Sequence, residues 1–365
     1  MTTETNRYLG YPDRLSVPAG ERIEFRLSSE QPSVKVEVLR LRCADVDANG
    51  PGFKYDVVAS AIDGVHPCAD QPIRPGSCAV IPHDGALTPR ADGWSFGAFV
   101  HPTLVGETAK AIMGVWRAET ECGWALEIDP DGRPALLLGA RRFTLAAAVP
   151  LHTWSFVGAS FSLEAGTATV SLITPPDGTR PERSFVETFA IEGDVLVASE
   201  PDFLIAAHHL DGAGRYVAHF DGKIEAPRVF AASMSPEDLY GFTLAPRTGA
   251  TATDLVAFWD FSIGITTLAI EDVSPNRLHG RLLQLPRRGV TGFFWSGAVH
   301  DFRFAPKEYA AIHFHGDDIY DCGWRTTFAL DVPEDWRTGV YALRLTPEDA
   351  APGDASESYV TFFVT

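Results

Sequence analysis

The chain is built largely from short segments in which hydrophobic and polar residues alternate, the pattern of β-strands that bury one face. Residues 21–29 (ERIEFRLSS) alternate apolar and charged positions, and residues 33–42 (SVKVEVLRLR) repeat the alternation. The short connection between them favours a hairpin. Because proline and glycine separate such segments along the chain, the pattern predicts an all-β protein.

The C-terminal end carries the same pattern. Residues 326–349 predict a strand, a Pro-Glu-Asp turn and a second strand, and residues 358–365 (SYVTFFVT) predict a closing strand. Neither end alone supplies the roughly seven strands of an immunoglobulin-like sandwich. We therefore expect the two ends to form one immunoglobulin-like β-sandwich that is interrupted by the middle of the chain.

The middle of the chain has longer and more aromatic strand segments. Residues 129–132 (DPDG) predict a hairpin turn with glycine where the backbone needs a positive φ. One helix start is strong, because Ser235 suits the N-cap, Pro236 suits the first helical position, and acidic residues follow. We expect one short helix in an otherwise β-rich domain.

Charge and cysteine usage exclude several classes of protein. Lys and Arg number 30 against 48 Asp and Glu, so the formal charge of −18 disfavours binding to nucleic acid or to anionic membranes. No apolar run is long enough to span a bilayer, and the N-terminal residues lack the order of a signal peptide. The five cysteines are odd in number and never spaced as CxxC, so we expect reduced thiols and a cytoplasmic protein.

The most chemically loaded segment is residues 310–324 (AAIHFHGDDIYDCGW). His313 and His315 share one face if the segment is a strand, and Asp317 and Asp318 follow, so together they are candidates for a metal site. The alternative is that the aspartates cap a turn and the histidines fill an interface or bond to backbone. We favour the alternative and assign no metal here.

A second candidate metal site is the segment EDVSPNRLHG. Asp272, Ser274 and Asn276 offer alternating oxygen atoms, which suit calcium, although a full calcium shell needs about six or more ligands. The alternative is an Asx-type turn that satisfies backbone donors. We favour the turn and leave calcium open.

Catalytic and sugar-binding signals are weak. The chain has no GxSxG elbow, and the paired histidines 208–209 fall in a predicted loop. Eight tryptophans make a sugar platform worth considering, but several of them sit inside alternating strands, where an indole is more often part of the core. These are Trp94, Trp116, Trp124 and Trp154.

The middle region resembles a concanavalin-like, laminin-G type jelly roll. The resemblance rests on residues 222–230 (GKIEAPRVF) and on the short helix signal at residues 235–239. A further hallmark, residues 255–282 (LVAFWDFS to HGRL), is usual near the start of such a domain but follows the helix here, so the order looks permuted. The expected division is residues 1–90 and 293–365 for the sandwich and 91–292 for the jelly roll.

The whole chain resembles the N-terminal, non-catalytic region of the large (beta) subunit of the N,N-dimethylformamidase family. The resemblance is carried by WDFS…DVSPNRLHG, HFHGDDIYDCGW and the final SYVTFFVT. It implies iron held by Tyr, His and Glu in a further α/β domain after the final strand, and no residue here matches those ligands. It thus implies no catalytic residue and no cofactor in this chain.

The resemblance also implies partners. They are a catalytic domain or chain of the same amidohydrolase, a small subunit and a second large chain, in an oligomer that hydrolyses small N-substituted amides. On that basis the chain alone is expected to be inactive, with a role in structure and assembly. The alternative is a freestanding jelly-roll module that binds carbohydrate or another ligand.

Overall fold

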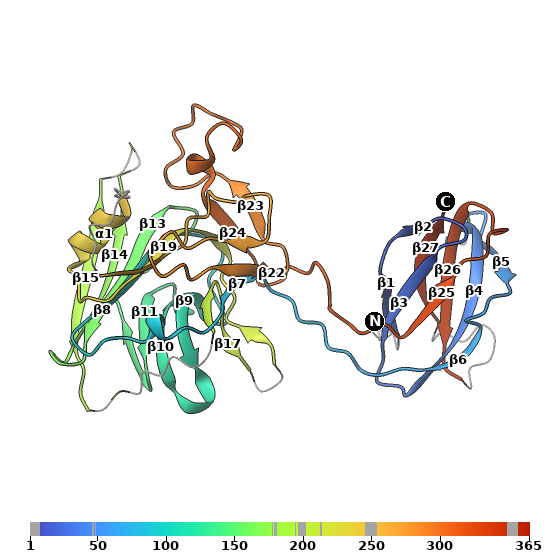
Figure 1. Ribbon diagram of the computed structural model, residues 1–365, viewed down its shortest axis with the longest axis horizontal. Helices are drawn as coiled ribbons and strands as arrows, with labels where there is room; N and C mark the ends of the chain where they lie inside the picture. The colour runs from blue at the N-terminus through green and yellow to red at the C-terminus, as the bar shows by residue number, and fades with distance from the viewer. Residues whose placement is uncertain are drawn as a thin grey trace. The chain divides into compact units, whose positions relative to one another are not determined.

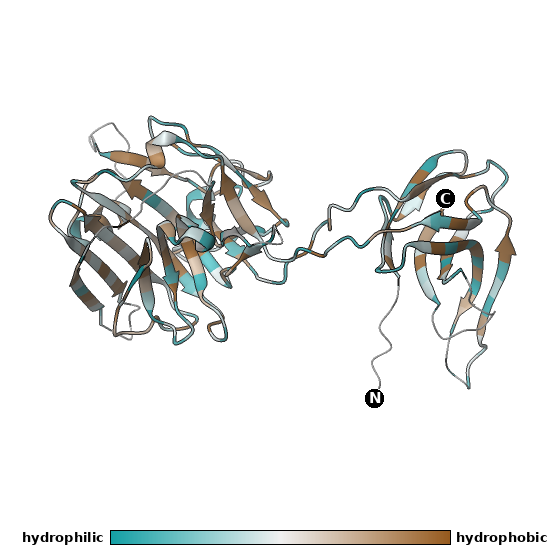
Figure 2. Ribbon diagram, turned by 90° about the horizontal axis from the view of Figure 1, so that it is seen from below, coloured by the Kyte–Doolittle hydropathy of each residue, from teal (hydrophilic) through white to brown (hydrophobic). Residues whose placement is uncertain are grey.

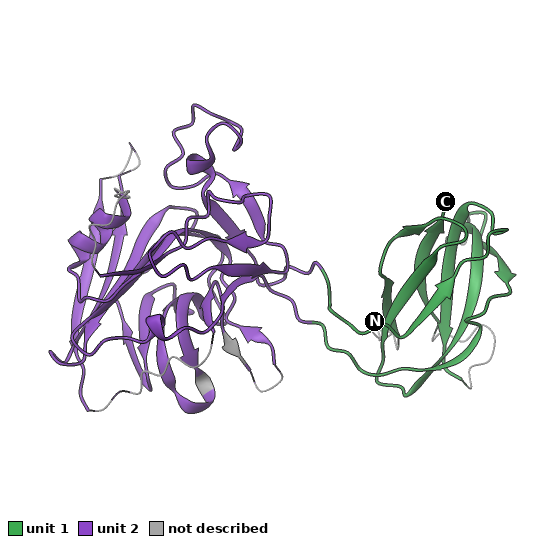
Figure 3. Cartoon of the chain, in the orientation of Figure 1, with its two compact units in different colours: residues 1–73, 321–365 green, residues 74–320 purple. Residues whose placement is uncertain are grey.

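The computed structural model describes residues 8–45, 47, 49–176, 178, 181–193, 195, 202–211, 214–244, 254–348 and 357–365. The chain divides into two compact units, which Figure 3 colours separately. The sandwich unit contains residues 1–73 and 321–365, and the jelly-roll unit contains residues 74–320. Nearly all regular structure in the described residues is β-strand, as the alternating pattern predicted.

The sandwich unit is assembled from both ends of the chain (Figure 1). One sheet has the order β1-β3-β25, and the other has the order β2-β27-β26-β4-β5, with β6 also paired to β4. The strands are β1 (Leu9–Pro12), β2 (Ser16–Val17), β3 (Arg22–Ser28), β4 (Ser33–Ala44), β5 (Phe53–Val58), β6 (Gly64–Pro67), β25 (Phe328–Asp331), β26 (Gly339–Thr346) and β27 (Ser358–Val364). Because β26 pairs with β4 and β25 with β3, neither end could complete the sandwich alone.

The core of the sandwich unit follows the alternation in the sequence. Ile23, Phe25 and Leu27 are fully buried, whereas the residues between them on β3 are partly exposed. From the opposite sheet, Phe362 packs edge-on against Phe25 with ring centroids 5.3 Å apart. Figure 2 shows the resulting alternation of hydrophobic and hydrophilic residues along the strands.

The jelly-roll unit has two eight-stranded sheets. The first has the order β12-β11-β10-β9-β16-β7-β22-β21. The second has the order β15-β14-β13-β8-β19-β24-β23, with β20 paired to β19. A short hairpin, β17-β18, stands apart from both.

The first sheet comprises β7 (Cys78–Ile81), β9 (Lys110–Arg117), β10 (Cys122–Ile128), β11 (Pro134–Leu138), β12 (Arg141–Thr144), β16 (Phe203–Ile205), β21 (Ala269–Ile270) and β22 (Gly280–Leu283). The second comprises β8 (Trp94–Pro102), β13 (Ser155–Ser162), β14 (Thr167–Thr174), β15 (Arg183–Ala190), β19 (Gly222–Phe230), β20 (Leu255–Phe258), β23 (Arg287–Val290) and β24 (Ala311–Phe314). The remaining elements are β17 (His208–Leu210), β18 (Tyr216–Val217), α1 (Pro236–Leu244) and the short 3₁₀ helices at Gly85–Leu87, Ala118–Thr120 and Pro306–Tyr309.

Two apolar layers hold the jelly-roll unit together. The main core contains the fully buried Trp124 and Trp259 together with Ile224 of β19. A smaller cluster, which includes Phe99 and Phe230, lies on the other face of the second sheet and is covered by α1. The second sheet is therefore buried on both faces at this point, which explains why its strands read as nearly continuous apolar runs.

The helix begins where the sequence predicted. The Ser235 hydroxyl accepts the backbone N–H of Asp238 at 3.1 Å, as an N-cap side chain does, and Pro236 is the first helical residue. The helix is nine residues long and buries Leu239 against the second sheet. Among the described residues, no helix combines the length and the apolar character that a membrane crossing requires.

The unit boundaries differ from the expected division at residues 90 and 292. Residues 74–90 belong to the jelly-roll unit, because β7 pairs with β16 and β22. Residues 293–320 belong to it too, because β24 pairs with β19 and β23. A four-residue apolar strand looks the same in either sheet architecture, so the pattern along the chain could not assign these strands to a unit.

Candidate functional site

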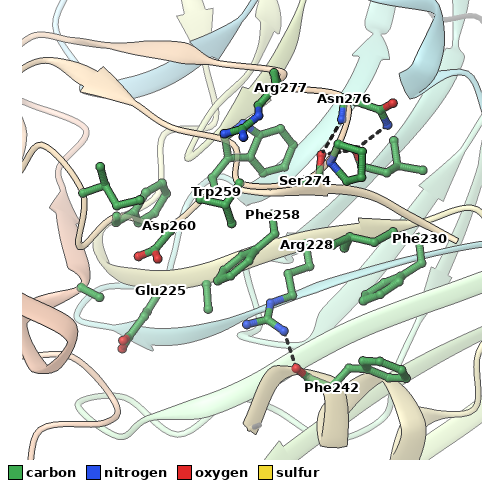
Figure 4. A pocket seen from close by; sticks show the side chains of 18 of the residues that line it. Glu225, Arg228, Phe230, Phe242, Phe258, Trp259, Asp260, Ser274, Asn276 and Arg277 are labelled. Carbon is green, nitrogen blue, oxygen red and sulfur yellow. Dashed lines mark hydrogen bonds between the residues drawn. The ribbon is translucent and has the colours of Figure 1, made fainter. Parts of the chain in front are cut away.

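The jelly-roll unit contains a large cavity, of about 1100 Å³, against the second sheet (Figure 4). Strand β19 contributes Glu225 and Arg228 to its lining, and β20 contributes Phe258. The loop that follows β20 adds Asp260, and Lys307 comes from the short helix at 306–309. Apolar side chains and a few charged ones therefore converge on one space, which is the usual make-up of a ligand pocket.

A β-bulge in β19 turns Glu225 and Arg228 to the same face. In the pairing with β8, Glu225 lies opposite Phe99 and Arg228 opposite Gly97, so β19 uses one extra residue. Ala226 takes a φ of 52° within this bulge. Residues three apart on a regular strand point to opposite faces, so only the extra residue brings both charged side chains to the cavity.

Arg228 of the cavity is a buried arginine whose hydrogen-bond donors are only partly satisfied. It is only 4% exposed, and its guanidinium lies 3.9 Å from the centroid of the Phe258 ring. Its Nη1 donates to the carbonyl of Phe242, whereas Nε and Nη2 are buried without a hydrogen-bond partner. Burial lowers the pKa of Arg228 to about 10, against the opposing effect of Asp260, so the side chain is charged at neutral pH.

Glu225 lies next to Arg228 on the same face and is almost completely buried. Its Oε2 accepts the backbone N–H of Phe293, and a Cβ at position 292 would lie 2.4 Å from the same oxygen. Glycine at 292 is therefore needed for this close approach of the loop. Burial raises the pKa of Glu225 to about 8, so most of the carboxyl groups are neutral at pH 7.

Another wall of the cavity is a loop held by one ion pair and one hydrogen bond. Asp260 Oδ2 accepts from Lys307 Nζ at 2.5 Å, and Asp260 Oδ1 accepts from the Ser262 hydroxyl at 2.6 Å. Burial opposes ionisation, but these bonds outweigh it and lower the pKa of Asp260. Arg288 braces the same loop by donating to five backbone carbonyls between residues 261 and 269.

The structure places His313 and His315 away from this cavity lining, on β24 and just after it. Their ring centroids are 4.1 Å apart, so they share a face as predicted. Lys223 lies opposite His313 in β19, and Arg287 lies opposite it in β23. Burial first, and then the neighbouring positive groups, lower the pKa of His313 to about 4. A pair flanked by cations does not suit a metal ion.

The predicted carboxylate partners of the histidines are engaged elsewhere or exposed. Asp318 Oδ2 accepts from the Ser77 hydroxyl at 2.6 Å, and Asp317 is exposed. Among the described residues, no group of three or more His, Cys, Asp and Glu side chains is arranged to hold a metal ion.

Replacing His313 and His315 together by glutamine should leave the metal content of the purified chain unchanged. The physical reason is that Lys223 and Arg287 flank the pair and oppose the binding of a cation. Elemental analysis by plasma mass spectrometry, with the unaltered chain purified in parallel, provides the measurement. Loss of a stoichiometric metal in the double variant would show that the histidines are ligands.

Asp272 is completely buried and has its oxygens fully occupied by the protein. Oδ1 accepts the backbone N–H groups of Phe258 and Ser274 at 2.9 and 2.8 Å. Oδ2 accepts the Ser274 hydroxyl at 2.7 Å and the backbone N–H of Leu278 at 2.8 Å. The amide of Asn276 donates to the carbonyl of Val256 at 2.8 Å. Asp272, Ser274 and Asn276, the candidate calcium ligands, thus make the hydrogen bonds within the protein that the alternative of a turn predicts.

The other candidates from the sequence are the tryptophans and the paired histidines 208–209. Trp94 and Trp124 are buried in the main core, while Trp116 and Trp154 are partly exposed. His208 is buried, with Nε2 2.9 Å from the carboxylate of Glu127, which also contacts Arg142. Of the neighbouring His209, the side chain lies outside the described residues.

Sequence reasoning missed the cavity residues. Glu225 and Arg228 stand inside the stretch that we used only as a jelly-roll hallmark. The available signal was two charged residues, three apart and separated by Ala-Pro, within a strand whose other residues are mostly apolar. Proline and a charged pair inside a buried strand together indicate a β-bulge.

Comparison with protein families finds a match for the C-terminal part of the chain. Residues 287–365 match the family described as N,N-dimethylformamidase beta subunit-like, C-terminal. The N,N-dimethylformamidase beta subunit of Paracoccus aminophilus is 32% identical over 99% of this chain and 49% of its own length. That of an Alcaligenes species is 30% identical over 97% of this chain and 48% of its own length. The chain thus spans about half the length of these relatives.

Among solved structures, a candidate carbohydrate-binding protein from Bacteroides ovatus shows similarity over 76% of this chain and 91% of its own. The TM-score is 0.41 and the sequence identity 11%.

Proposed function

Because the chain belongs to the N,N-dimethylformamidase beta-subunit family, we propose that it is a β-rich structural and assembly part of an amidohydrolase for small N-substituted amides. The observation that carries the proposal is the extent of the match. Identity runs through 99% of this chain but only 49% of the Paracoccus relative. About half of that relative has no counterpart in this chain. We assign the catalytic iron site to a domain or chain that corresponds to that unmatched half.

The described residues support a role without catalysis. The two family signatures that are richest in polar residues are engaged in holding the fold. Trp259 of WDFS is buried and donates to the carbonyl of Leu278 at 2.7 Å. In HFHGDDIYDCGW, Gly316 donates to Asp221 at 2.9 Å and Trp324 donates to the carbonyl of Pro72 at 3.0 Å. These contacts hold loop segments of the two signatures in place.

The proposed setting is an oligomer in the cytoplasm, with a catalytic domain or chain and a small subunit as partners. The cysteine chemistry is compatible with a reducing compartment, because all five cysteines are free thiols in the structure. Burial raises the pKa of Cys78 to about 12, so this thiol is inert in the core.

Activity measurements on the chain alone and in its native assembly test the proposal. We expect the purified chain to release no dimethylamine from N,N-dimethylformamide. We also expect the assembly isolated from its source to contain a second iron-bearing polypeptide segment and to hydrolyse the amide. Amide hydrolysis by the chain alone would contradict the proposed division of labour. A monomer with no such partner, whose melting temperature rises with glycans, would instead favour a freestanding carbohydrate-binding module.

A further inference from the structure

We propose that the cavity of the jelly-roll unit is a binding site for a small organic carboxylate, an anion carried on an apolar or aromatic body, and that Arg228 recognises the anion. The inference goes beyond the proposed function, because it concerns a ligand of this chain and requires no amide hydrolysis. It rests on three observations, which are the unsatisfied guanidinium, the charge balance of the cavity and its apolar walls.

The guanidinium of Arg228 lacks the partners that a buried arginine normally has. Within the described part of the chain, no carboxylate comes within ion-pair distance of it, and its protein hydrogen bond is made by Nη1 alone. Nε and Nη2 are buried and unpaired. A buried arginine is costly unless an anion accepts its donors, and adjacent guanidinium N–H groups match the two oxygens of a carboxylate.

The charged groups around the cavity favour an anion. The cationic side chains are Arg90, Arg228, Arg277 and Lys307, and the acidic ones are Glu225, Asp254 and Asp260. Asp260 is already paired with Lys307, and Glu225 is largely neutral at pH 7. The cavity is therefore net positive although the whole chain carries a formal charge of −18, and such local reversal attracts anions to the site.

The walls of the cavity fit an apolar body next to the anion. The apolar lining residues include Phe230, Phe242, Leu255, Phe258, Phe261 and Val273. The volume of about 1100 Å³ admits a molecule considerably larger than a free inorganic anion. Because neighbouring atoms cover Nε and Nη2, the proposal requires the Arg228 side chain to turn toward the cavity when a carboxylate binds.

Calorimetry with a matched set of probes tests the site on the whole chain. Phenylacetate supplies an anion and an aromatic body, phenylacetamide is its neutral analogue, and acetate lacks the body. We expect phenylacetate to bind at least about 10-fold more tightly than either of the others. Equal binding of phenylacetate and phenylacetamide, or no binding of phenylacetate at millimolar concentration, would overturn the proposal without the use of any variant.

The Arg228→Met variant identifies the recognising group, because methionine keeps an unbranched apolar stem but has no charge. We expect it to lose the preference for phenylacetate over phenylacetamide while it remains folded. Arg303→Met is the matched control, since Arg303 is exposed, pairs with Asp301 and does not line the cavity. Retention of the full preference in Arg228→Met, or its loss in Arg303→Met, would overturn the assignment to Arg228.

Discussion

The Asp272→Ala variant is expected to lose about 3–5 kcal/mol of the free energy of unfolding. Alanine removes a buried carboxylate that accepts four hydrogen bonds, three from backbone N–H groups and one from a hydroxyl. The three backbone N–H groups lose their acceptor, whereas the Ser274 hydroxyl keeps the carbonyl of Val256, and the isolated bridge between Trp259 and Asp272 loses its anchor. Chemical denaturation followed by tryptophan fluorescence measures the loss.

Asp317→Ala is the matched control for this variant. Asp317 is an exposed carboxylate in the other loop that we considered for metal binding, and its removal is expected to change stability by less than about 0.5 kcal/mol. Chelation should leave the melting temperature of the unaltered chain unchanged, because protein donors already occupy both oxygens of Asp272. A clear fall on chelation would show that calcium stabilises the fold.

The Glu225→Gln variant is expected to change how stability depends on pH. The folded chain holds a proton on Glu225 up to about pH 8, whereas an exposed glutamate releases it near pH 4.5. Between these values the folded state binds more protons than the unfolded state, so stability falls as the pH rises. Glutamine stays neutral and keeps an acceptor for the Phe293 N–H, and it therefore removes this slope.

The size of the effect follows from the width of that window. Relative to the unaltered chain, the variant should gain about 3–5 kcal/mol of stability between pH 4.5 and pH 8, with no further change above pH 8. Denaturation curves across the window measure it, with the exposed Glu164→Gln as a control that should differ by less than about 0.5 kcal/mol at either end. Parallel pH curves for Glu225→Gln and the unaltered chain would contradict the prediction.

The sequence pattern was sufficient to predict the strands at both ends of the chain, the start of the helix and the joining of the two ends in one sandwich. The alternation in residues 21–29 and 33–42 became β3 and β4, and the closing residues became β27. The expected hairpin between β3 and β4 was wrong, because the two strands lie in different sheets. Ser235 and Pro236 started the single α-helix of the described chain where capping chemistry places it. The strands and the helix start depend on neighbours within a few residues, which is why the sequence reveals them. The link between the two ends followed instead from the number of strands at each end, which is too small for a sandwich.

The two loops with candidate metal ligands show where spacing alone becomes ambiguous. Asp272 and Asn276 have the spacing of oxygen ligands and also that of an Asx turn, and only the positions of Phe258 and Leu278 reveal where the Asp272 hydrogen bonds go. For His313, the decisive neighbours are Lys223 and Arg287, which strand pairing brings beside it. The electrostatic character of a strand residue depends on its cross-strand neighbours, which the sequence does not place.

By itself, the sequence determined that this is an all-β protein, that its ends form a sandwich and that it is related to dimethylformamidase beta subunits. Only the tertiary structure decided that β7 and β24 belong to the jelly-roll unit and that Glu225 and Arg228 face one cavity. Strand formation follows from residues that are adjacent in the chain. Sheet membership, the bulge in β19 and the burial of Arg228 follow from pairing between distant segments, which a local pattern does not encode.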